Sequence, residues 1–139
     1  SAAMLASGEM RLAGISILVA EDNEINQMIL EENLRDEGAR VVLASDGQQA
    51  VSAVENAAPG TFDIILMDVM MPLLDGYQAT RRISELRPGL PIIGQTAHVM
   101  GAERDACFAA GMIDHIAKPI DPDELVAKIL RHVVRQPAH

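Results

Sequence analysis

The sequence is poor in aromatic residues and has a single cysteine, and each shortage excludes a class of structure. It contains no Trp, one Tyr and two Phe in 139 residues, so its core has to be built from aliphatic and methionine side chains. Cys107 cannot form an internal disulfide, and nothing therefore points to an oxidising compartment. Its helical surroundings, RDACFAAG, predict a small buried side chain rather than a reactive thiol.

Basic residues and long apolar runs are also scarce. Eleven Lys and Arg stand against 20 Asp and Glu, a formal net charge of −9, so we expect no nucleic-acid partner. No apolar run approaches the roughly 20 residues of a membrane span, and we expect no membrane contact by this domain. Residues 1–14 lack the basic leader of a signal peptide, which indicates a tag or an interdomain linker.

What the chain does have is apolar residues, 49% of the total, in a repeating pattern. They predict one domain at residues 15–135, followed by a tail at 136–139. Short apolar runs, rich in Ile, Leu and Val, predict five strands at 15–20, 40–44, 62–67, 91–96 and 113–117.

Stretches with helical spacing separate these runs. Asn23 is a predicted cap for the first helix, in which Ile25 and Ile29 are expected to face the core, with Leu30 and Leu34 as weaker candidates. The last helix begins at Asp121, where Glu124 is expected to complete a capping box. Five alternating strands and helices predict an α/β fold with a parallel sheet covered on both faces.

Polar residues follow four of the five predicted strands. Glu21 and Asp22 end the first, Asp68 the third, Thr96 the fourth and Lys118 the fifth. Because ligands of open α/β sheets bind at the carboxyl ends of the strands, we expect these side chains to meet at one edge. Taken singly, most have ordinary explanations as loop residues or a helix start, whereas a carboxylate within IILMDVMMP is costly to bury alone.

The combined charges indicate a chemistry. Three carboxylates and one lysine leave about two negative charges, and an all-oxygen set favours Mg²⁺, with Mn²⁺ as a substitute. Such a site suits phosphoryl transfer, with Asp68 as the nucleophile, Lys118 neutralising phosphoryl oxygens and the Thr96 hydroxyl donating to one of them.

The blocks ILVAEDNEINQ, DIILMDVMMPLLDGYQATRRI, PIIGQTAH and GMIDHIAKPI resemble the receiver domain of two-component response regulators, over residues 15–134. The resemblance implies a doubly wound (βα)5, flavodoxin-like fold with strand order 2-1-3-4-5. EDNEINQ and GQTAH look most like receivers attached to hybrid sensor histidine kinases; a stand-alone single-domain response regulator is the alternative.

The resemblance also implies roles for individual residues. Asp68 would accept a phosphoryl group from a phosphohistidine. Asp22 and Asp68 would bind Mg²⁺ directly, the backbone carbonyl of Met70 would add a ligand, and Glu21 would act mainly through a water. Lys118 would pair with the phosphoryl group, and its peptide bond to Pro119 would be cis.

Further positions are assigned on the same grounds. Pro72 and Gly76 would shape the loop after the phosphoacceptor. Thr96 would move toward the phosphoryl group as part of a switch. The family usually has Tyr or Phe three residues before the lysine, whereas this chain has His115. His115 is therefore either the switch residue, with a pH-sensitive movement, or a half-exposed strand residue. His98 is expected to be a loop residue.

The expected partners are a histidine kinase or a histidine phosphotransfer domain, and a weak homodimer is a further expectation. The domain would catalyse its own phosphorylation and slow dephosphorylation in the cytoplasm, whether or not the parent protein is a membrane-anchored histidine kinase.

A phosphatase of the haloacid dehalogenase type would need an Asp at the position of Met70, and its nucleophile would end the first strand. A pseudo-receiver that only docks partners would not need the complete set of five polar residues.

Overall fold

The computed structural model describes residues 10–97 and 101–133. Its strands and helices alternate along the chain as predicted. The strands are β1 (Ser16–Ala20), β2 (Arg40–Ala44), β3 (Ile64–Asp68), β4 (Ile92–Thr96) and β5 (Asp114–Ala117). The helices are α2 (Glu24–Asp36), α3 (Gly47–Asn56), α4 (Gly76–Leu86), α5 (Ala102–Ala110) and α6 (Pro122–His132). No helix in the described ranges is long and apolar enough to cross a bilayer.

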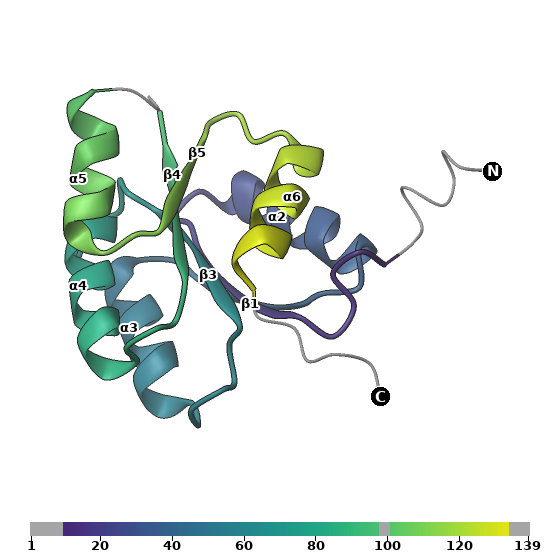
Figure 1. Cartoon of the computed structure of the whole chain (residues 1–139), viewed down its shortest axis with the longest axis horizontal. Coiled ribbons are helices and arrows are strands. Elements are labelled where there is room, and N and C mark those ends of the chain that lie inside the picture. Colours follow the sequence, from purple (N-terminus) through teal and green to yellow (C-terminus); the bar gives the residue numbers. More distant parts are fainter. Residues whose placement is uncertain (1–9, 98–100, 134–139) are drawn as a thin grey trace.

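The five strands form one parallel sheet with the order β2-β1-β3-β4-β5, which confirms the predicted doubly wound fold. Helices α3, α4 and α5 cover one face, and α2 and α6 cover the other (Figure 1). The central strand β3 is buried at all five positions, as its uninterrupted apolar sequence predicts. Two aliphatic clusters, one on each face, make up the core, and Cys107 is buried in the cluster under α3, α4 and α5.

Side chains at the helix starts explain where most helices begin. Asn23, Asp46, Asp75 and Asp121 each accept a hydrogen bond from a backbone amide in the first turn. The capping box predicted for α6 is wrong, because Asp121 accepts from the amide of Asp123 instead. A capping box forms at α4, where Asp75 and Gln78 bond each other's backbone amides.

The predicted inward face of α2 is also wrong in part. Leu30 and Leu34 are buried, whereas Ile25 and Ile29 are 68% and 51% exposed. The apolar residues of α2 cover more than one stripe of the helix, and the stripe of Leu30 and Leu34 packs on the sheet. Together with Met28, also exposed, Ile25 and Ile29 form an outward apolar face of α2.

Residues 10–14, which precede the predicted domain, pack against it. Leu12 is fully buried in the cluster under α2 and α6. The Arg11 guanidinium bonds both carboxylate oxygens of Glu37, at 3.0 and 2.6 Å, and reaches Asp123 at 3.1 Å. This pairing lowers the pKa of the Glu37 carboxyl. Arg11 and Leu12 therefore belong to the packed unit.

Candidate functional site

The carboxyl ends of β1 and β3, which are neighbours in the sheet, bring three acidic residues together. Glu21, Asp22 and Asp68 each offer an oxygen, and these oxygens lie within 4.8 Å of one another. Lys118 follows β5 and reaches the same edge. The predicted convergence of these four residues is therefore confirmed in the geometry, and it comes from strand ends that lie far apart in the sequence.

Asp68 is buried, with 1% of its surface exposed. The ammonium of Lys118 lies 2.8 Å from Oδ2, and the amide of Met70 donates to Oδ1 at 3.1 Å. Both carboxylate oxygens thus have a donor, which offsets the cost of removing the charge from water. The carboxylate therefore lies at the end of the central strand, near the molecular surface but not itself exposed to solvent.

Glu21 is equally buried and less well paired. Its Oε2 accepts a hydrogen bond from the amide of Asn23 at 3.1 Å, while Oε1 lies 3.8 Å from the Lys118 nitrogen and has no hydrogen-bond donor among the described residues. Burial raises the pKa of Glu21 to about 7, and the charge of Asp68 acts in the same direction, against the Asn23 amide and Lys118. The carboxylates outnumber the nearby cation, so the set fits a divalent cation bound by oxygen.

The loop between β3 and α4 is held close to the site by two glycines. A Cβ on Gly76 would lie 2.2 Å from the carbonyl oxygen of Asp68, and one on Gly47 would lie 1.8 Å from that of Leu74. Any larger residue would push the loop away from the sheet. In the same loop Leu73 has φ +68° and is 83% exposed, a left-handed conformation that is unfavourable for leucine.

Thr96 and Lys118 lie on neighbouring strand ends, where the amide of Lys118 donates to the carbonyl of Thr96 at 2.8 Å. Thr96 is fully buried, and its hydroxyl has no partner among the described residues. The peptide bond between Lys118 and Pro119 is cis, as the resemblance implies. The hydroxyl and the lysine thus flank the edge at which Asp68 lies.

His115 is half-buried on β5, and its ring packs edge to face on Phe108 with 5.9 Å between centroids. Its Nδ1 is buried without a partner in the described part of the chain. These contacts fit a strand residue packed under α5, and a switch role for His115 stays a prediction. His98 lies outside the described residues.

The sequence did not indicate the place of two polar residues near the site. The side-chain amide of Gln27 donates to the carbonyl of Glu21 at 2.5 Å and to the hydroxyl of Ser45 at 3.2 Å, which fixes the turn that carries Glu21 and Asp22. The spacing of Gln27 in EDNEINQ is the only sequence signal for this contact. Gln95, on β4 beside Thr96, is the other residue, a buried polar side chain that apolar periodicity could not identify.

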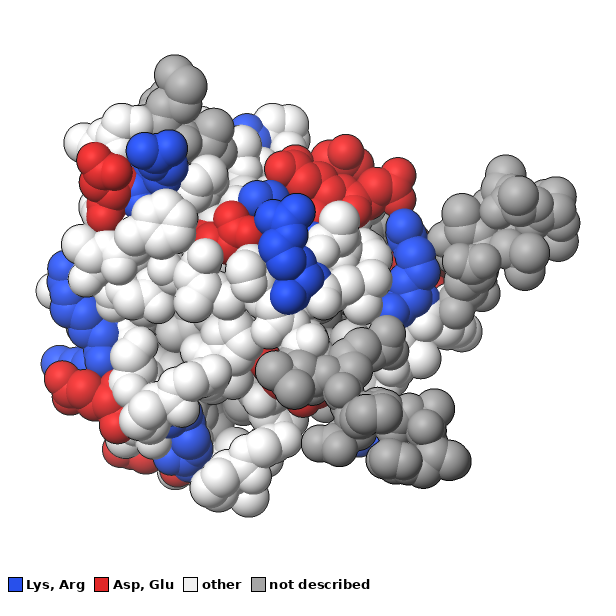
Figure 2. All heavy atoms as spheres, viewed as in Figure 1, with Lys and Arg blue, Asp and Glu red and all other residues white. Residues whose placement is uncertain are grey.

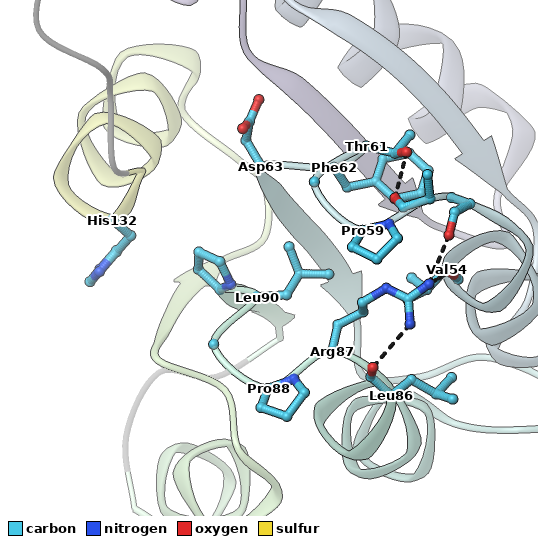
Figure 3. Close-up of a pocket in the computed structure, with 15 residues that line it drawn as sticks. Val54, Pro59, Thr61, Phe62, Asp63, Leu86, Arg87, Pro88, Leu90 and His132 are labelled. Atoms are coloured by element: carbon cyan, nitrogen blue, oxygen red, sulfur yellow. Dashed lines mark hydrogen bonds between the residues drawn. The ribbon is translucent and has the colours of Figure 1, made fainter.

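A cavity of about 530 Å³ at the opposite edge of the sheet offers no comparable chemistry (Figure 3). Arg87 lines this cavity, and its guanidinium donates hydrogen bonds to the carbonyls of Leu86, Val54 and Ala57. His132, which also lines it, bonds the Asp114 carboxylate at 2.8 Å. The reactive set therefore lies at the carboxyl edge of the sheet.

Comparison with known proteins agrees with this location. The family model of the response regulator receiver domain matches residues 17–130. The sensor protein GacS of Pseudomonas syringae is 38% identical over 120 residues, which cover 83% of this chain and 13% of GacS. The chain thus spans about an eighth of the length of that relative.

Two solved structures resemble the chain closely. The receiver domain of the sensor histidine kinase PA1611 from Pseudomonas aeruginosa, solved with a magnesium ion in its active-site cleft, is 43% identical, with a TM-score of 0.77 over 86% of this chain and 98% of that one. A chain from the complex of the Saccharomyces cerevisiae phosphotransfer protein Ypd1 with the receiver domain of Ssk1 is 29% identical, with a TM-score of 0.79 over 86% and 88%. By fold, by sequence and by the matched family model, this chain belongs to the family of response regulator receiver domains.

Proposed function

We propose that this domain is the phosphoacceptor of a two-component phosphorelay and that Asp68 takes the phosphoryl group from a phosphohistidine. One observation carries the proposal: a buried carboxylate ends the central strand, paired with Lys118 at 2.8 Å and grouped with two further carboxylates. A purely structural carboxylate would need its lysine partner, but it would gain nothing from two more negative charges beside it.

In the proposed reaction a carboxylate oxygen of Asp68 forms a bond to phosphorus while the bond from phosphorus to the donor's imidazole nitrogen breaks. The imidazole retains the electron pair of that bond. Lys118, which already touches Oδ2, is placed to neutralise charge on the phosphoryl oxygens. The buried hydroxyl of Thr96, free of other partners in the described chain, is available to donate a hydrogen bond to one of them.

The residues present fit Mg²⁺. Asp22 and Asp68 would hold it directly with the carbonyl of Met70, and Glu21 would contribute mainly through a water. The buried Oε1 of Glu21, which has no hydrogen-bond donor among the described residues, supports this role. When bound, Mg²⁺ supplies positive charge that screens the incoming phosphoryl group from the carboxylates.

We assign the conformational switch to Thr96 and His115. Each has a buried polar atom without a partner in the described ranges. The strand register pairs Gly94 with His115 and Thr96 with Ala117, so the two side chains lie on the same face of the sheet, one on each of two adjacent strands. A movement of one side chain would therefore alter the packing around the other on the face of the sheet that α5 covers.

The partner we propose is a histidine kinase or a histidine phosphotransfer domain. Its phosphohistidine has to reach Asp68, so its surface has to cover the carboxyl edge of the sheet. The apolar face of α2, formed by Ile25, Met28 and Ile29, begins next to this edge and is free for such contact in the structure. The likeness to GacS and to the PA1611 receiver supports an origin in a hybrid sensor kinase.

Surface charge and the single cysteine support the remaining expectations about partners and location. Figure 2 shows acidic side chains gathered over the start of α6, with basic side chains scattered and no continuous basic surface on this face. Such a surface favours a protein partner over nucleic acid. A cytoplasmic location fits the single, buried and unpaired Cys107.

The test is phosphorylation of the purified domain with acetyl phosphate, or with a purified phosphodonor domain, followed by intact mass. One phosphoryl group should be added with Mg²⁺ and none in EDTA, and Asp68→Asn should abolish the addition. Asp63→Asn is the matched control, because Asp63 precedes the same strand at its other end and bonds the Ser16 amide. Phosphorylation that persists in Asp68→Asn would overturn the assignment.

A further inference from the structure

Gln95 has a side chain that the proposed phosphotransfer site does not use. It lies on β4 with 1% of its surface exposed, on the same face of the sheet as Ile93, which packs under α2 and α6. Its side-chain nitrogen, Nε2, is buried and has no hydrogen-bond partner among the described residues. Burying an amide group in this way costs about 1–3 kcal/mol unless something else pairs with it.

Gln95 lines a cavity of about 150 Å³ between α2 and the loop that follows β5. Asn26 and Asn33 line it from α2, and Pro119 lines it from the loop. Ile29 and Pro119 are exposed while Gln95 is buried, so the cavity opens to solvent at its rim and Gln95 lies at its buried end. It has room for several waters or for one short side chain.

The groups around this cavity disfavour a charged ligand. Its polar lining consists of the three carboxamides and Lys118, whose ammonium is held by Asp68 at 2.8 Å and lies 3.8 Å from Glu21. An anion entering the cavity would approach the acidic set without a free cation to meet it. A cation would find no carboxylate in the lining and would lose its hydration. Carboxamides both donate and accept, and their best complement is another neutral carboxamide.

The position of the cavity, next to the apolar face of α2, indicates which molecule would fill it. Ile29 belongs both to its rim and to the exposed apolar face of α2. A protein that covers this face to reach Asp68 would also cover the mouth of the cavity. We propose that the cavity is a socket for one Asn or Gln side chain of the phosphodonor protein, with Gln95 as the residue that recognises it. The identity of the partner rests on the proposed function, whereas binding of a carboxamide does not.

The first experiment uses the domain alone, with saturating Mg²⁺ so that the acidic set does not attract cations. Propionamide, the side-chain analogue of glutamine, is titrated while NMR follows the side-chain amide signals of Gln95, Asn26 and Asn33. A ligand of this size should bind with a Kd on the order of millimolar. Propionate and propylammonium, which have nearly the same shape, should bind at least about tenfold more weakly.

Two variants make the result specific. Gln95→Met removes the amide at similar volume and should abolish the shifts that propionamide causes at Asn26 and Asn33. Thr80→Val is the matched control: Thr80 is also fully buried, with a hydroxyl that has no partner in residues 10–97 and 101–133, but it lies on α4, beyond the other face of the sheet. Thr80→Val should leave propionamide binding unchanged. Absence of binding at about 100 mM propionamide, or equal binding of the charged analogues, would overturn the proposal.

A second measurement tests the occupant. Phosphorylation rates of Gln95→Met are measured with acetyl phosphate and with the purified phosphodonor domain used for Asp68. The ratio of the rate with the protein donor to the rate with acetyl phosphate should fall about tenfold, the loss of one hydrogen bond of ordinary strength, through a raised KM. An unchanged ratio would overturn the assignment to the partner. Failure of the proposed function would be seen separately, as phosphorylation of Asp68→Asn with propionamide binding intact.

Discussion

Glu21 should make the domain less stable as the pH rises, because its carboxyl group is buried beside another carboxylate. Burial raises the pKa of Glu21 from 4.5 to about 7. The folded state therefore binds a proton that the unfolded state has released between these two values. Stability from this group is fully present below pH 4.5 and is lost as the pH rises through 7. A shift of this size corresponds to about 3 kcal/mol above pH 7.

The perturbation that isolates this effect is Glu21→Gln, which stays neutral at every pH. In EDTA, urea unfolding of the variant and the wild type should give similar free energies near pH 4.5. At pH 8 the variant should be more stable by about 3 kcal/mol. With saturating Mg²⁺ at pH 8 the gap should narrow, because the cation binds the wild-type carboxylates and stabilises the folded state by mass action.

Glu24→Gln is the control, since Glu24 lies exposed in the first turn of α2 and reports the general effect of removing one negative charge. A raised pKa of Glu21 would be refuted if the free-energy difference between Glu21→Gln and the wild type were the same at pH 4.5 and pH 8 in EDTA. That result would mean that Glu21 is solvated or paired well enough to stay charged at no cost.

Three further predictions concern stability and use urea unfolding at neutral pH. Gly76→Ala should destabilise the domain by about 3 kcal/mol, because its Cβ would meet the Asp68 carbonyl; Gly89→Ala, where a Cβ meets no atom, should cost only about 1. Leu12→Ala should cost about 3 kcal/mol, as a core leucine does, and no loss would show that residues 10–14 are not part of the fold. Leu73→Asn should stabilise by about 1 kcal/mol, since asparagine tolerates a φ of +68° better; a destabilised variant would contradict a strained leucine.

The sequence was sufficient for the order of elements and for the main polar set because both depend on local signals. Apolar runs and capping residues mark the strands and helix starts, and a parallel sheet necessarily brings its carboxyl ends to one edge. Asp68, Glu21, Asp22 and Lys118 could therefore be grouped from their positions after predicted strands. The strand limits differ from the prediction by at most two residues.

What the sequence could not decide depends on contacts between distant segments. The apolar residues of α2 occupy neighbouring stripes, and helical spacing alone does not say whether the stripe of Leu30 or that of Ile29 meets the sheet. Leu12 lies in a segment of small residues without periodicity, and its place depends on Arg11 meeting Glu37. Gln95 is a single polar residue in an apolar strand, and this pattern does not indicate a cavity. The cavity forms where α2 and the loop after β5 stand apart, and the sequence does not show that spacing.

The anchoring of residues 10–14 has a mechanical consequence for any chain attached before Met10. Tension on that chain is borne first by the ion pair between Arg11 and Glu37 and by the buried side chain of Leu12. The load passes into α2 and the core under α6 before it reaches Ser16, where β1 begins. A pull on a chain attached before Met10 would therefore load this segment before it reached β1, whose far end precedes the carboxylates of Glu21 and Asp22.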